Sequence, residues 1–130
     1  MSPKELNRDF DIQDKDTISS SGMDLSEKTR SASFLQQDNK VEFYRSLIEG
    51  VEIASTDNAL KNIPEAKEYY GANFRLLGRD FPQDTEGGYF IRVKKNAVVQ
   101  LPIQACLFLK AQAFKQKVHN LIMFEEGARV

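Results

Sequence analysis

The feature that most constrains the fold is a short pattern that occurs twice near the end of the chain. Val93–Val99 and Phe124–Val130 each contain an apolar residue, two charges, a residue that tolerates a left-handed backbone, alanine and a strand-like ending. Asn96 and Gly127, the tolerant residues, lie 31 positions apart. Such a recurring β-turn-β unit is typical of a β-solenoid, in which each coil pairs mainly with its neighbours. An antiparallel sandwich or a jelly roll also fits the pattern.

The segment that contains both copies has the residue pattern of a β-protein. Runs rich in Val, Ile, Leu and Phe are separated there by short polar breaks and not by helical stretches. We expect turns at Lys94–Asn96 and Glu125–Gly127, with their charged side chains in water. The predicted strands are Tyr89–Val93, Val98–Leu109 and Lys117–Phe124.

The middle of the chain predicts short elements of both kinds. Val51–Ala54 has the pattern of a short strand, and Ser55 or Thr56 can cap a short helix that follows it. Proline is favoured at the first position of a helix, so Pro64–Tyr70 predicts a second short helix, ended by Gly71. We therefore expect these short elements to connect other parts of the fold and not to form most of its core.

Polar and glycine-rich stretches divide the chain into three parts. The residues up to Gln37 are polar, and few of them could anchor a core, so we expect an extended or partly disordered arm. Lys40–Gly50 fits a helix face and partly fits strand alternation, and Gly78–Gly88 predicts a loop. The predicted parts are a polar arm (residues 1–37), a region of short helices and extended segments (38–88) and a β-rich region (89–130).

Charge and cysteine content narrow the class of protein. The 18 basic and 19 acidic side chains leave a formal charge of −1, so no net basic field is available for nucleic acid or an anionic membrane. No apolar run reaches the roughly 18 residues of a membrane span, and the first ten residues lack the apolar core of a secretory signal. A single cysteine cannot form an intramolecular disulfide. We therefore expect a cytoplasmic protein.

Two side chains, Cys106 and His119, are the natural candidates for a metal site. The apolar neighbourhood of Cys106 favours a buried small hydrophobic residue over a ligand, and an iron–sulfur cluster normally needs several thiolates. His119 is the only histidine, and a lone imidazole with no nearby His or Cys is more often structural or at the surface. The sequence therefore predicts no metal, cofactor or catalytic residue in this chain.

The remaining candidate motifs favour structural roles. Glu125 and Glu126 are neighbours in a turn, so solvated charges are favoured over paired catalytic carboxylates. Gly87-Gly88 lacks the spacing of a phosphate-binding loop and is interpreted as a hinge into the first strand of the β-rich region. Five lysines could form a basic strip, but solvent-facing positions are favoured, because acidic residues cancel any large field. These are Lys94, Lys95, Lys110, Lys115 and Lys117.

The order of several segments resembles the N-terminal part of the SufB/SufD family of iron–sulfur cluster assembly scaffolds. The resemblance covers roughly residues 20 to 130 and rests on Ser21–Asp38, Val51–Leu60 and Gly87–Val130. QKVHNLIMFEEGA, residues 116–128, is its most specific part. No single catalytic motif carries the match.

The resemblance implies a particular architecture and function. Family members have an N-terminal region of short helices and extended segments, a central right-handed parallel β-helix and a C-terminal region that docks an ABC-type ATPase. The implied fold is mainly β with short N-terminal helices (α+β), a truncated beginning of the β-helix. The implied partners are a SufC-like ATPase and a SufB/SufD-like paralogue, or self-association. In full-length family members, the residues that hold the cluster and those that contact the ATPase lie later in the sequence than the part that this chain resembles. The resemblance therefore implies that this chain acts by protein–protein assembly and not as an enzyme.

A second class of function remains open on sequence grounds. A small β-solenoid or cupin-like enzyme, metal-dependent or polysaccharide-active, would share the β-rich texture. A cupin-type site needs several metal ligands, whereas the chain offers one histidine. A solenoid cut after Val130 would also leave a free end, for which we expect self-association or marginal stability.

Overall fold

Two three-stranded β-sheets, with helices outside them, organise the computed structural model, which describes residues 15–78 and 86–130. The predictions for residues 1–14 and for 79–85 of the expected loop lie outside the described residues. Strands outnumber helices, so the fold is mixed α/β, and the described sheets do not close into a barrel or a complete solenoid. The elements are α1 (Lys15–Ser20), β1 (Ala32–Gln37), β2 (Lys40–Ser46), β3 (Val51–Ser55), α2 (Thr56–Asn62), α3 (Pro64–Leu77), β4 (Tyr89–Val93), β5 (Ile103–Phe108) and β6 (Leu121–Phe124).

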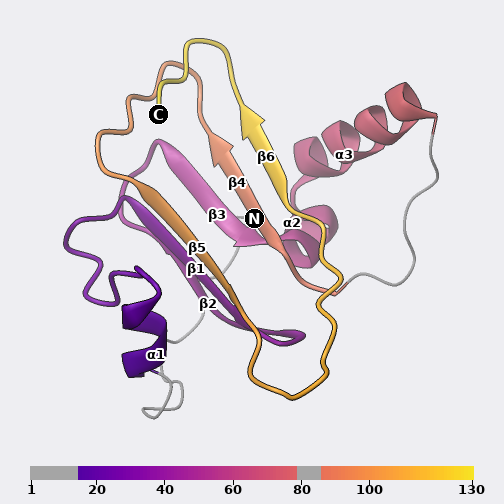
Figure 1. The fold of residues 1–130 in the computed structure, drawn as a ribbon. Helices are drawn as coiled ribbons and strands as arrows, with labels where there is room; N and C mark the ends of the chain where they lie inside the picture. Colours follow the sequence, from indigo (N-terminus) through magenta and orange to yellow (C-terminus); the bar gives the residue numbers. More distant parts are fainter. Residues whose placement is uncertain (1–14, 79–85) are drawn as a thin grey trace.

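Each sheet combines one antiparallel and one parallel pairing. The first has the strand order β2-β1-β5, with β1 antiparallel to β2 and parallel to β5. The second has the order β3-β4-β6, with β4 antiparallel to β3 and parallel to β6. Figure 1 shows the sheets as separate layers, with α1 outside the first and α2 and α3 beside the second. The chain therefore leaves the second sheet after β4, passes through β5 in the first sheet and returns as β6.

The 31-residue repeat corresponds to the parallel register of β4 and β6. Phe90 pairs with Leu121 and Val93 with Phe124, and an isolated parallel bridge joins Val98 to Arg129. The predicted turns occupy equivalent positions, since Asn96 has a φ of 61° and Gly127 a φ of 77°. The Asn96 backbone N–H also donates to the Glu126 carbonyl, 3.0 Å away. The prediction of equivalent turns is confirmed.

The three predicted strands of this region form with different lengths. The first is β4 as predicted, whereas β5 begins at Ile103 and β6 at Leu121. Pro102, which has no N–H, stands immediately before β5. Before β6, the His119 carbonyl accepts a hydrogen bond from the Thr56 hydroxyl, and the Asn120 side chain accepts one from the Tyr89 N–H, 3.0 Å away. These residues are held by side-chain contacts instead of a strand ladder.

The expectation that residues up to Gln37 contribute little to a core is wrong from residue 15 onward. β1 is the central strand of its sheet, and Ala32, Phe34 and Leu35 are almost fully buried. Ile18 of α1 packs with Leu35 on the outer face of the same sheet. Polar residues of β1 are buried because they have hydrogen-bond partners: the Ser33 hydroxyl accepts from the Gln104 side chain, 2.7 Å away.

The middle of the chain forms the predicted elements with two differences. β3 forms as predicted, Ser55 caps α2 by accepting from the Asn58 N–H at 3.1 Å, and the ambiguous segment becomes the strand β2. The prediction that Gly71 ends the second helix is wrong. α3 runs on to Leu77 and ends at Gly78, which has the left-handed conformation with a φ of 64°. Gly71 is buried within the helix, where its cost of about 1 kcal/mol relative to alanine is tolerated.

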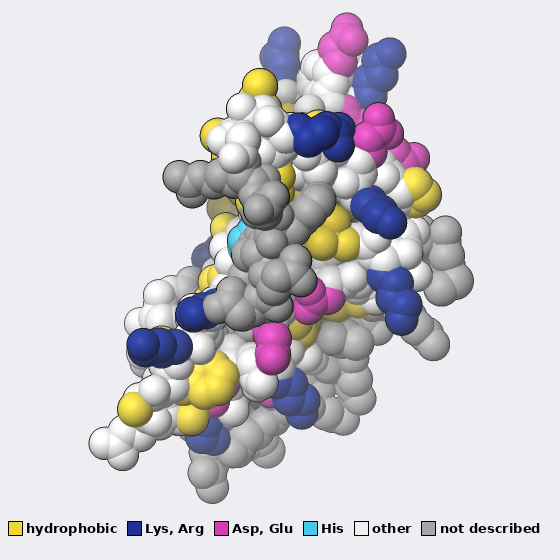
Figure 2. Space-filling view, turned by 90° about the vertical axis from the view of Figure 1, so that its right-hand side faces the viewer, with side chains coloured by type: hydrophobic (Ala, Val, Ile, Leu, Met, Phe, Trp, Pro, Cys, Tyr) yellow, Lys and Arg dark blue, Asp and Glu magenta, His cyan; other side chains and the backbone are white. Residues whose placement is uncertain are grey.

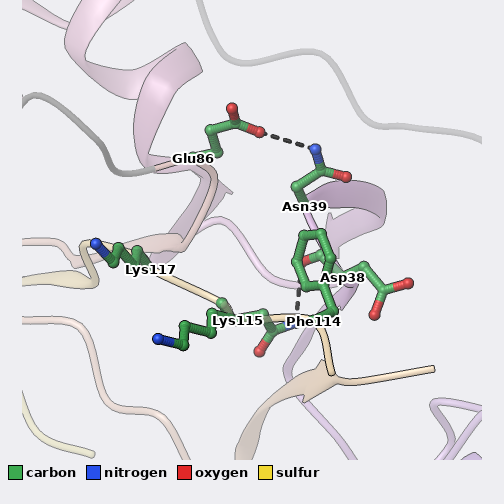
Figure 3. Close-up of a pocket in the computed structure, with 7 residues that line it drawn as sticks. Asp38, Asn39, Glu86, Phe114, Lys115 and Lys117 are labelled. Atoms are coloured by element: carbon green, nitrogen blue, oxygen red, sulfur yellow. Dashed lines mark hydrogen bonds between the residues drawn. The ribbon is translucent and has the colours of Figure 1, made fainter. Parts of the chain in front are cut away.

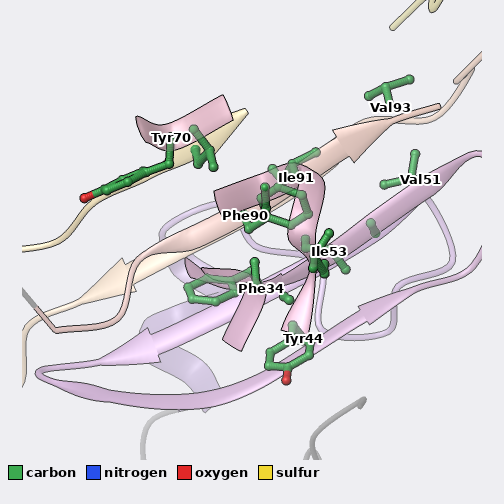
Figure 4. Packing of buried hydrophobic residues seen from close by; sticks show 14 of the residues in the cluster. Phe34, Tyr44, Val51, Ile53, Tyr70, Phe90, Ile91 and Val93 are labelled. Carbon is green, nitrogen blue, oxygen red and sulfur yellow. The ribbon is translucent and has the colours of Figure 1, made fainter. Parts of the chain in front are cut away.

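The larger core lies between the sheets and under α2 and α3. Phe34 and Tyr44 come from the first sheet, and Ile53 and Phe90 from the second (Figure 4). The Tyr89 ring meets Phe34 edge-on with centroids 5.9 Å apart, so the face of β4 that carries Tyr89, Ile91 and Val93 is directed toward the first sheet. The opposite face carries Arg92, whose guanidinium is 2.5 Å from the Glu52 carboxylate.

The Gly87-Gly88 dipeptide is a tightly packed junction between the two sheets. Gln36 of β1 is fully buried, its side-chain oxygen accepts from the Gly88 N–H at 2.7 Å, and its amide donates to the Asp38 carbonyl at 2.9 Å. A Cβ on Gly87 would overlap the Gln36 side chain, and one on Gly88 would overlap the His119 carbonyl oxygen. Both glycines also have positive φ angles, 77° and 89°. The hinge interpretation is thus replaced by a close backbone approach.

Alanine substitutions at two glycines separate backbone strain from steric overlap. Gly78 has a positive φ, and no atom lies within 4 Å of the place that a Cβ would take, so Gly78→Ala should destabilise the fold by about 1 kcal/mol. Gly88→Ala adds the clash with the His119 carbonyl and should cost about 3 kcal/mol. Urea unfolding of the wild-type chain and both variants measures these losses. Equal losses for the two variants would contradict the close approach at Gly88.

Candidate functional site

His119 belongs to an aromatic cluster that joins α3 to the segment before β6. Its ring lies parallel to that of Phe74, with centroids 5.5 Å apart, and tilted against that of Tyr70 at 5.4 Å. The Tyr70 hydroxyl is hydrogen-bonded to Nδ1 of His119. Burial raises the pKa of Tyr70 and the negative charge of Asp57 raises it further, so the hydroxyl stays protonated and can donate to the imidazole. The structure thus places His119 in a structural contact.

Cys106 lies half-buried on the outer face of β5. It packs against the smaller core cluster, which contains Ile18, Met23, Leu35 and Phe43. Burial raises the pKa of the Cys106 thiol, and a hydrogen bond with the Ser21 side chain opposes that effect. The thiol is therefore predominantly protonated at neutral pH, which disfavours its use as a metal ligand or nucleophile.

The acidic pair and the five lysines do not converge on one place. The Glu125 carboxylate accepts from the Lys95 N–H at 3.0 Å and so bridges the two stacked turns, whereas Glu126 is exposed. Lys94 and Lys95 lie in the turn after β4, and the other three lysines follow β5 at the opposite end of the molecule (Figure 1). The possible basic strip is therefore divided between two ends.

A small hollow lies beside the connection that follows β5. It has a volume of about 140 Å³ and is lined by residues from the β1–β2 turn, the start of the β4 segment and this connection. The Asn39 side chain donates to the Glu86 carboxylate at 2.9 Å (Figure 3). The Asp38 carboxylate accepts from the Lys110 N–H at 2.9 Å. The hollow carries both signs of charge, and its polar groups bind one another.

The rest of the described surface shows no cluster of side chains suited to metal binding or catalysis. Within residues 15–78 and 86–130, no group of three His, Cys, Asp or Glu residues could hold a metal ion. Over the same ranges, none of the helices combines the length and apolar character needed to cross a bilayer. Figure 2 shows basic, acidic and apolar side chains interspersed on the face turned toward the viewer. No catalytic constellation is visible in the described part of the chain.

The polar residues that hold this architecture together were missed in the sequence. The Gln104 side chain binds the loop before β1 by accepting from the Asp24 N–H and donating to the Asp24 carbonyl, both at 2.8 Å. Thr56 and Gln36 are buried at the junction near Gly88. Their partners are distant in the chain, so periodicity and local motifs contain no signal for them.

Comparison with known proteins finds relatives that carry one and the same description. No protein-family model matches the chain. It is 36% identical over 121 residues to an iron–sulfur cluster assembly SufBD family protein of Archaeoglobus fulgidus, covering 90% of this chain and 32% of the relative. It is 27% identical over 124 residues to a protein of the same description in Methanothermobacter thermautotrophicus, covering 89% of this chain and 30% of that protein. The chain thus spans about a third of the length of these curated relatives.

Removing one hydroxyl tests the aromatic cluster. Tyr70→Phe keeps the ring and deletes the hydrogen bond to His119, so the free energy of unfolding should fall by about 1 kcal/mol. Tyr69→Phe is the matched control, because Tyr69 is the neighbouring, exposed tyrosine and its change should stay within about 0.5 kcal/mol. Urea denaturation measures both. Equal effects would show that the Tyr70 hydroxyl contributes no specific stability.

Cys106 should behave as a packing residue. Cys106→Ala removes a half-buried sulfur from the smaller cluster and should cost about 1 kcal/mol. Because the pKa of the thiol is raised, the folded chain should react with iodoacetamide more slowly than the urea-unfolded chain between about pH 7 and 9. Faster alkylation of the folded chain would instead show an activated thiol.

Proposed function

This chain is SufBD-like in sequence, and from that premise we propose that it is the N-terminal portion of a scaffold for iron–sulfur cluster assembly. The observation that carries the proposal is the relationship over nine-tenths of the chain, together with the parallel 31-residue register of β4 and β6. The function is protein–protein assembly. The chain is proposed to have no enzymatic activity of its own.

The proposed architecture is the beginning of a right-handed parallel β-helix. Two parallel ladders support it, β1 with β5 in one sheet and β4 with β6 in the other. The chain passes from one sheet to the other and back between β4 and β6, as it does in one coil of a solenoid. The short helices and antiparallel strands that precede β4 would then cover the start of the coils.

The cluster and its ligands are proposed to lie in the part of a full-length family member that this chain does not span. The support is chemical: a cluster held by protein thiolates commonly uses four cysteines, and this sequence has one. That cysteine packs against apolar side chains, and its pKa is raised by burial. No resident cofactor is therefore proposed for this chain.

The proposed partners are a SufB/SufD-like paralogue and a SufC-like ATPase, in the cytoplasm. The balanced charge of the sequence supports protein partners over nucleic acid or an anionic membrane. Contact with the ATPase is assigned to the remainder of the assembled scaffold, so this chain should join the ATPase only through a SufB/SufD-like protein.

Co-purification tests the proposal. The tagged chain should retain a SufB/SufD-like protein from the same cell, and a SufC-like ATPase only when that protein is also present. Anaerobic incubation with ferrous iron and sulfide should give no stoichiometric cluster by visible absorbance, and Cys106→Ala should give the same result. Failure to retain the SufB/SufD-like protein, or a stoichiometric cluster that disappears in Cys106→Ala, would overturn it.

A further inference from the structure

We draw no further inference here: the strongest candidate, the surface patch of exposed Tyr69, Leu76 and Leu77 on α3, is an apolar face for which nothing in the structure shows what covers it.

Discussion

Parallel pairing of β4 with β6 is the constraint on which the rest of the structure depends. Parallel neighbours cannot be joined by a tight hairpin, so the chain must travel away and come back before it can form the ladder. Here the return path contributes β5 to the other sheet, where it pairs in parallel with β1. The segment that follows β4 therefore supplies β5 to the first sheet and β6 to the second. The two sheets consequently cannot be assembled independently.

The register of that return is held by contacts at both ends of β4. At its beginning, Thr56 lies between the carbonyls of Tyr89 and His119, and Gly88 leaves no room for a side chain against His119. Beyond its end, Asn96 and Gly127 stack as equivalent left-handed turns. α3 adds the aromatic contact from Tyr70 and Phe74 to His119. The helices thus have a direct part in placing β6 beside β4.

The sequence predicted the elements whose signals are local. β3, β4, a helix cap at Ser55 or Thr56 and the individual turns at Asn96 and Gly127 each depend on residues close to one another in the chain, and the structure assigns the cap to Ser55. The pairing of the two turns was predicted from the 31-residue repeat. β1 was missed because its burial depends on Gln104 and Gly88, which satisfy Ser33 and Gln36 from far along the sequence. From composition alone, Ser33 and Gln36 are expected to be polar residues that face solvent. The end of α3 was missed because a glycine can be accommodated within a helix when its left-handed conformation is not required.

The stacked turns also have a consequence for how the length of such a chain can change in evolution. The side chain of Asn96 occupies the space that a Cβ at position 127 would need, so the two turns fit together only in one alignment. An insertion between β5 and β6, in the connection around Ala111–Gln116, lengthens a surface loop and leaves that alignment unchanged. A single insertion between Val93 and Val98 shifts the bridge from Val98 to Arg129 relative to the ladder of β4 and β6. Length variation among related chains should therefore accumulate in the connection and be rare in the turns.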